Sequence, residues 1–143
     1  MLTAAAVVVC ALDLLGRSSG SIAPIRFLDV PPRGASRNVE AFVMRNPDTI
    51  YLITSTETFR TAQHAVGDPG RRAACRHMAG VIVHEEWHLR HGADEQGAYL
   101  AQVTMLAALG ANTESLNAVR RSMRFVADRE KKRRRAELTI ASR

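Results

Sequence analysis

The sequence predicts a small α+β domain in which a short β-hairpin covers a central helix. Three observations lead to this fold class. Apolar residues recur at helical spacing from residue 71 onward, and two short runs before residue 54 have the composition of β-strands. The chain has 143 residues with 46% apolar content, which fits a single domain. Only 5% of the residues are aromatic, so we expect aliphatic side chains to fill most of the core.

Residues 1–16 form an apolar stretch that is rich in Ala and Val. This stretch fits two interpretations, the hydrophobic part of a signal peptide or a helix that packs at the start of the domain. No Lys or Arg precedes it and Asp13 interrupts it, which counts against a signal peptide. It is also short for a transmembrane helix. Both interpretations stay open, and with them an exported and a cytoplasmic location.

The next part of the chain predicts a connector and a hairpin. Residues 17–37 are rich in Gly, Ser and Pro and contain one short extended piece at Ile25–Val30. Asn38–Met44 and Thr49–Ile53 have the composition of strands, and Asn46-Pro47-Asp48 between them is typical of a turn. The two strands therefore predict an antiparallel hairpin.

Four helices are expected after the hairpin, each separated from the next by a glycine-containing break. They span about Glu57–Ala65, Arg71–Arg90, Asp94–Leu109 and a segment that begins at residue 112 or 113. In the second helix Ala79, Val83 and Trp87 recur every four residues, which indicates a buried side. The last helix is expected to end after Val126, where a run of charged residues begins.

The second of these helices carries the pattern His84-Glu85-Glu86-Trp87-His88. Two histidines four residues apart lie on one face of a helix, one turn apart, so both imidazoles can bind one metal ion. Glu85 projects from the edge of that face, where it can reach a water molecule at the metal without being a ligand. Glu86 is expected to be a plain surface charge.

A catalytic zinc site usually has three protein ligands, so a third ligand must come from elsewhere. His91 lies about 10 Å from His84 along an unbroken helix, which is far for sharing one ion. Asp94 and Glu95 follow Gly92, where the chain can turn back towards the metal. Asp94 is well placed to cap the next helix, which leaves Glu95 free to bind. We therefore favour Glu95 and keep Asp94 as the alternative.

The stretch HEEWHLRHGADEQGAYLAQ, residues 84–102, resembles the zinc peptidases of the zincin group, and gluzincins most of all. The resemblance implies a Zn²⁺ cofactor held by His84, His88 and Glu95. It also implies hydrolysis of a peptide or protein substrate by a metal-activated water, with Glu85 as the general base. The short spacing to Glu95 departs from thermolysin-like members, whose Glu ligand lies much further along the chain. The sequence is also similar to small bacterial proteins in which an acidic-x-x-Ala-Tyr segment follows the motif.

Further roles follow from the same resemblance, each with a simpler alternative. An extended substrate would lie along an edge strand, for which Thr49–Ile53 is the candidate; otherwise the sheet only covers the helix. Tyr99 and His91 could each stabilise an oxyanion, but Tyr99 also fits the core and His91 a solvated helix end. His64 and His77 have no partner at ligand spacing and are expected to be ordinary surface or boundary residues.

The formal charge of +6 is concentrated at the C-terminal end, where residues 120–143 carry +7. The five cations of Lys131–Arg135 fit a solvated helix end or a contact with an anionic surface. No aromatic residue interrupts them, so nucleic-acid binding is not favoured. We divide the chain into an N-terminal segment (1–23), a metallopeptidase-like domain (24–127) and a basic tail (128–143). The alternative function is a non-catalytic domain that holds zinc and docks through this tail, in an oligomeric state that the sequence does not indicate.

The chain has two cysteines, Cys10 and Cys75, and neither belongs to a C-x-x-C pair. Their spacing alone does not indicate a disulfide. Because free cysteines are among the most buried residues, we expect two small buried thiols.

Overall fold

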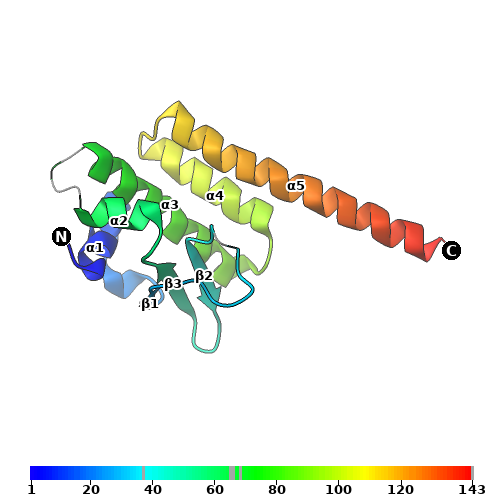
Figure 1. Cartoon of the computed structure of the whole chain (residues 1–143), viewed down its shortest axis with the longest axis horizontal. Coiled ribbons are helices and arrows are strands. Elements are labelled where there is room, and N and C mark those ends of the chain that lie inside the picture. Colours follow the sequence, from blue (N-terminus) through cyan, green and yellow to red (C-terminus); the bar gives the residue numbers. More distant parts are fainter. Residues whose placement is uncertain (37, 65–66, 68, 143) are drawn as a thin grey trace.

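The computed structural model describes residues 1–36, 38–64, 67 and 69–142 as a helical domain with a small sheet, which confirms the α+β class. In chain order the elements are α1 (Ala4–Leu14), η1 (Ser19–Ser21), β1 (Ile25–Leu28), β2 (Ala41–Met44), β3 (Thr49–Ile53), α2 (Glu57–His64), α3 (Pro69–His91), α4 (Glu95–Ala108) and α5 (Thr113–Ala141). The predicted end of α2 at Ala65 lies outside the described residues. Figure 1 shows α3 in the middle of the molecule, between α4 and α5 on one side and α1, α2 and the sheet on the other.

The sheet has three strands in the order β1-β3-β2. β2 and β3 form the predicted antiparallel hairpin, and the extended piece that begins at Ile25 adds β1 in parallel to β3. Thr49–Ile53 is therefore the central strand, and the expectation that it forms an edge is wrong. A hairpin pattern does not reveal this arrangement, because a parallel partner joins through a long connection without a turn signal of its own. β2 is an edge strand instead.

The core gathers around α3, whose buried side faces α1, α2 and β3. Its largest fully buried side chains include Ile50 and Leu52 of β3, Phe59 of α2, and Met78 and Ile82 of α3. Aliphatic residues dominate this cluster, as the composition predicts. The central helix is thus held from several directions, which fixes the position of the side chains that it carries.

Helix α1 packs against α3 through Val7 and Ala11, both fully buried. Of the two interpretations of residues 1–16, α1 therefore matches the helix that packs at the start of the domain. The signal-peptide interpretation stays a prediction. Cys10 and Cys75 form a disulfide, with their Cα atoms 5.9 Å apart. The expectation of two free thiols is wrong because the packing of the two helices brings the cysteines within bonding range.

Removing this disulfide is expected to destabilise the fold. The bridge joins residues 65 positions apart, and in the chain-entropy description a loop of that length is worth about 4 kcal/mol of unfolding free energy. We expect a Cys10→Ala/Cys75→Ala variant to lose about that amount in urea unfolding. Reduced wild-type protein should unfold at the same urea concentration as the variant. Coincident transitions for the variant and the oxidised wild type would contradict the prediction.

Helix α5 is longer than predicted, because it continues through the charged run to Ala141 instead of ending after Val126. Lys, Arg, Glu and Ala all have high helix propensity, and Arg133 pairs with Glu137 one turn on at 3.7 Å. Only Val119 of this helix is buried. The C-terminal half projects beyond the body of the domain (Figure 1), so the cations of Lys131–Arg135 are exposed on a helix. Among the described residues, no helix is both long and apolar enough to cross a membrane.

Candidate metal site

The turn between α3 and α4 brings the predicted ligands together. Gly92 has a positive φ of 84°, a conformation that favours glycine, and its N–H donates to the carbonyl oxygen of His88 at 2.9 Å. Asp94 is the N-cap of α4, since its Oδ1 accepts a hydrogen bond from the N–H of Gly97 at 3.2 Å. The predicted cap is confirmed, and Glu95 in the first turn is left free to point towards α3.

Close packing holds α4 against the end of α3. A Cβ atom at Gly97 would collide with the indole ring of Trp87, so only glycine permits this approach. From the other side, the guanidinium of Arg45 donates to the carbonyl oxygens of His88 and Leu89, at 2.9 and 3.1 Å. These contacts fix both ends of the turn, and hence the position of the first turn of α4 relative to the two histidines.

Three side chains converge on one point, and together they could hold a metal ion. The Nε2 atoms of His84 and His88 are 3.2 Å apart. One carboxylate oxygen of Glu95 lies 3.2 Å from Nε2 of His84, and the other lies 3.2 Å from Nε2 of His88. The histidine side chains are 10% exposed, whereas Glu95 is 46% exposed. The cluster is therefore buried on the histidine side and open on the carboxylate side.

Hydrogen bonds on the far side of each imidazole determine which ring nitrogen carries the hydrogen. Nδ1 of His84 lies 3.0 Å from Oε1 of Gln102, and Nδ1 of His88 lies 2.7 Å from the carbonyl oxygen of Gly92. Because both partners are acceptors, each Nδ1 carries the hydrogen and donates it. In the neutral form of each ring, Nε2 therefore directs a lone pair into the cluster, as a metal-binding histidine does.

These donors fit a tetrahedral metal ion. With metal–nitrogen bonds of about 2.0–2.1 Å, two ligands of a tetrahedral zinc ion lie about 3.3 Å apart. The separation of 3.2 Å between the two Nε2 atoms, and that of 3.2 Å between each Nε2 and one oxygen of Glu95, are close to that value. Nitrogen and carboxylate ligands are also among the types that zinc binds. Three such ligands would leave a fourth coordination position open, as in catalytic zinc sites.

Burial and pairing shift the pKa values in this cluster. Hydrogen bonds from His84 and then His88 lower the pKa of Glu95 to about 2. The hydrogen bond to Glu95 raises the pKa of His88 to about 9 in the metal-free protein. Burial raises the pKa of Glu85. The carboxylate of Glu95 is therefore held in its charged form beside the two imidazoles.

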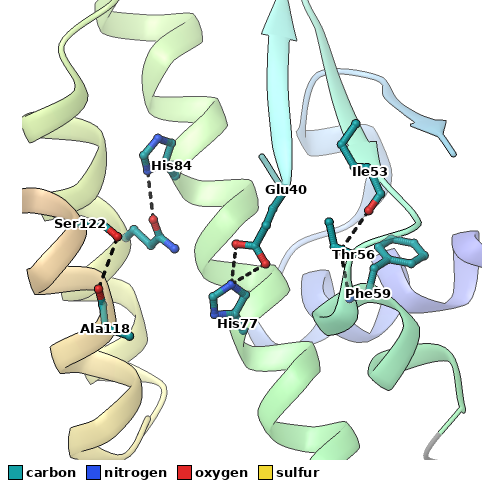
Figure 2. Close-up of polar contacts among 9 residues, drawn as sticks. Glu40, Ile53, Thr56, Phe59, His77, His84, Ala118 and Ser122 are labelled. Carbon is teal, nitrogen blue, oxygen red and sulfur yellow. Dashed lines mark hydrogen bonds and ion pairs between the residues drawn. The ribbon is translucent and has the colours of Figure 1, made fainter. Parts of the chain in front are cut away.

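A cleft of about 660 Å³ opens beside the cluster and is lined by His84, Glu85 and Glu95. Its walls are the chain that leads into β2 on one side and residues 118–126 of α5 on the other, with α3 and α4 as the floor. Further along the same floor, Nε2 of His77 lies 2.8 Å from a carboxylate oxygen of Glu40. Figure 2 shows this pair and His84 on one side of α3, with Ser122 of α5 nearby.

Other residues discussed in the sequence have different positions. The Tyr99 ring packs edge-on against His84, with centroids 4.6 Å apart, and also lines the cleft, and its role as an oxyanion donor stays a prediction. His91 is exposed and stacks on Trp87, away from the cleft lining. His64 is exposed, as expected.

The expectation that Glu86 is a plain surface charge is wrong. Its side chain is 13% exposed and pairs with Arg17 at 2.8 Å and Arg90 at 2.9 Å. The pair with Arg17 joins α3 to the segment after α1, a contact over 69 residues that spacing does not show.

Two polar contacts of the site were missed by reasoning from the sequence. Gln102 lies seven residues after Glu95, on the same face of α4, and it is buried. A polar residue at a buried helical position was the signal that could have revealed it. The pairing of His77 with Glu40 joins residues 37 positions apart and has no local signal.

Comparison with protein-family models, curated proteins and solved structures found no match for this chain. The likeness to zincins therefore rests on the motif itself and on the convergence of His84, His88 and Glu95.

Replacing Gln102 is expected to weaken metal binding without removing a ligand. In a Gln102→Leu variant the His84 ring would lose the acceptor for its Nδ1–H, and such supporting contacts are typically worth about 10–100-fold in metal affinity. We expect a drop of that size in zinc affinity by competition with a chromophoric chelator. Gln96→Leu, on the same helix but bonded to Glu130, is the control and should bind zinc normally. Unchanged affinity in Gln102→Leu would show that this contact does not support the site.

Proposed function

We propose that the protein is a zinc-dependent peptidase whose metal ion is held by His84, His88 and Glu95. The observation that carries the proposal is the convergence of the three side chains, in which the two Nε2 atoms are 3.2 Å apart and each lies 3.2 Å from one oxygen of Glu95, with Glu85 lining the cleft beside them. Two histidines on one helix, an intervening glutamate and an open fourth position form the arrangement expected for hydrolysis at a metal.

The chemistry would depend on Glu85 as the general base. A zinc ion bound at this site supplies a Lewis acid that lowers the pKa of water to near 7 and polarises a carbonyl group. Glu85 accepts a proton as the water oxygen attacks the carbonyl carbon of the peptide bond. It then delivers that proton to the amide nitrogen as the carbon–nitrogen bond breaks, which releases a carboxylate and an amine. The raised pKa of Glu85 suits both steps, because it brings the pKa closer to the working pH.

The proposed role of Glu85 as a general base favours zinc over other metals. Two histidines and one carboxylate also suit non-haem iron(II), which uses three such ligands with open positions. Iron chemistry of that kind does not need a general base next to the ligands, whereas hydrolysis does. Metal analysis of protein purified without added metal distinguishes the two.

An extended peptide would lie along β2, because β2 is an edge strand and Thr49–Ile53 is the central strand. The N–H of Ile53 donates to the carbonyl oxygen of Glu40 at 2.9 Å. In an antiparallel pair, alternate residues face the partner strand, so Ala41 and Val43 direct their backbone groups away from β3. These groups are free to pair with a substrate backbone, and the residues that lead into β2 line the cleft.

The direct test combines metal content with peptide cleavage. We expect one zinc per chain by mass spectrometry, and cleavage of a mixed peptide library that stops on dialysis against a chelator and returns on addition of zinc. Apo protein incubated with magnesium is the control and should stay inactive. A wild-type protein that binds zinc and cleaves nothing in the library would leave the non-catalytic domain, docking through the basic end of α5, as the better account. Stoichiometric iron would also overturn the proposal.

A further inference from the structure

The described lining of the cleft includes three glutamates and one arginine. Glu40 is paired with His77, and Glu95 is paired with His84 and His88. Glu85 is buried next to His84, and we have assigned it to the chemistry of the site. Arg121 of α5 also lines the cleft, and no residue in the described part of the chain bonds its guanidinium. Among the described cleft residues, Arg121 is the one Arg or Lys side chain, and no carboxylate is paired with it.

Arg121 belongs to a continuous face of α5 that forms the cleft wall. The residues of this face recur at helical spacing: Ala118, Arg121, Ser122, Phe125 and Val126. Phe125, one turn beyond Arg121, has a 64% exposed side chain although it is a large apolar residue. This wall therefore offers an unpaired cation one turn away from an exposed aromatic ring, and the guanidinium of Arg129 lies 5.9 Å from the centroid of that ring.

The distance between this wall and the candidate metal site determines how far from the cleaved bond a substrate group bound by Arg121 would lie. Tyr99 lies against His84 at 4.6 Å between ring centroids, and Tyr99 and Ser122 both line the cleft. His77 and His84 mark two points of the cleft floor, roughly 10 Å apart along α3. An extended peptide rises about 3.3 Å per residue, so the cleft spans about three residues on this side of the metal.

We infer that Arg121 is a specificity-determining residue that binds a carboxylate of the substrate within about three residues of the cleaved bond. The inference rests on the proposed function, because it takes the cleft to be the substrate site. A guanidinium binds a carboxylate through two parallel hydrogen bonds, which matches an acidic side chain or a free C-terminus. Phe125 then covers an apolar neighbour of that group.

The test measures binding rather than cleavage. The probe is a set of fluorescein-labelled octapeptides of Ala and Leu, each with a single Glu placed at successive positions, and the same peptides with Gln. Each peptide is made as a C-terminal acid and as an amide, which separates a side-chain carboxylate from a terminal one. Binding is measured by fluorescence anisotropy with zinc-loaded Glu85→Gln protein, which holds the site without turning the peptide over.

We expect at least one Glu position, or the free C-terminus, to bind about tenfold more tightly than its uncharged counterpart, as for a charge-assisted bidentate pair. Arg121→Gln in the same background should abolish that preference, and Arg121→Glu should favour a Lys peptide instead. Arg124→Gln is the matched control, because Arg124 is on the same helix but outside the cleft lining. It should keep the full preference and so exclude a general effect of net charge.

The two proposals can fail separately. One outcome is that the wild-type protein cleaves peptides, while Arg121→Gln keeps the same ratio of affinities for Glu and Gln peptides. This outcome would overturn the role of Arg121 and leave the peptidase proposal in place. A carboxylate preference that depends on Arg121, in a protein that cleaves nothing, would support the binding role and overturn the peptidase. Equal binding of Glu and Gln peptides, or no binding of any peptide in the set, would overturn the inference.

Discussion

Glu85→Gln is expected to bind zinc as tightly as the wild-type protein and to cleave peptides roughly 10²–10⁴-fold more slowly, the usual range for loss of a general base. Glutamine has nearly the same shape but does not accept the proton from water. Glu85 is buried beside the donor cluster without belonging to it, so the metal ligands should stay in place. Zinc content and initial rates on one peptide, measured on the same preparation, check both parts of the result.

Glu86→Gln is the matched control for this prediction. It removes the same charge one residue away, but Glu86 pairs with Arg17 and Arg90 on the other side of the helix from the cleft lining. We expect normal cleavage and a small loss of stability, about 1 kcal/mol at most for a partly exposed ion pair. Equal loss of activity in both variants, or an active Glu85→Gln protein, would remove Glu85 from the chemistry.

Glu95→Ala is expected to weaken zinc binding by at least about 100-fold, since a zinc site derives several kcal/mol from each ligand. The reason is geometric, because the two carboxylate oxygens of Glu95 each lie 3.2 Å from a histidine Nε2. Isothermal titration calorimetry at fixed pH measures the change in affinity.

Asp94→Ala is the control that separates the two candidates for the third ligand. Asp94 is occupied as the N-cap of α4, so its loss should cost about 1 kcal/mol of stability and leave zinc affinity unchanged. The reverse outcome, with zinc lost in Asp94→Ala and kept in Glu95→Ala, would make Asp94 the ligand.

The local part of the candidate site could be predicted from the sequence, because it depends on residues within a few turns of one another. Helical spacing alone places His84 and His88 on one face of α3. The turn at Gly92 and the cap at Asp94 were also predictable, because both depend on the conformational preferences of single residues. The end of α5 also depends on local preferences, because Lys, Arg, Glu and Ala favour helices and so extend α5 through the charged run.

Only the tertiary structure decided which distant residues complete the site. The support of His84 by Gln102, the pairing of His77 with Glu40 and the approach of Arg121 to the cleft all join different elements. The disulfide and the central place of β3 are of the same kind. The sequence by itself therefore determined the metal-binding face and its turn, because these follow from backbone geometry over a few residues. The cleft followed from packing, in which each contact depends on where every other element lies.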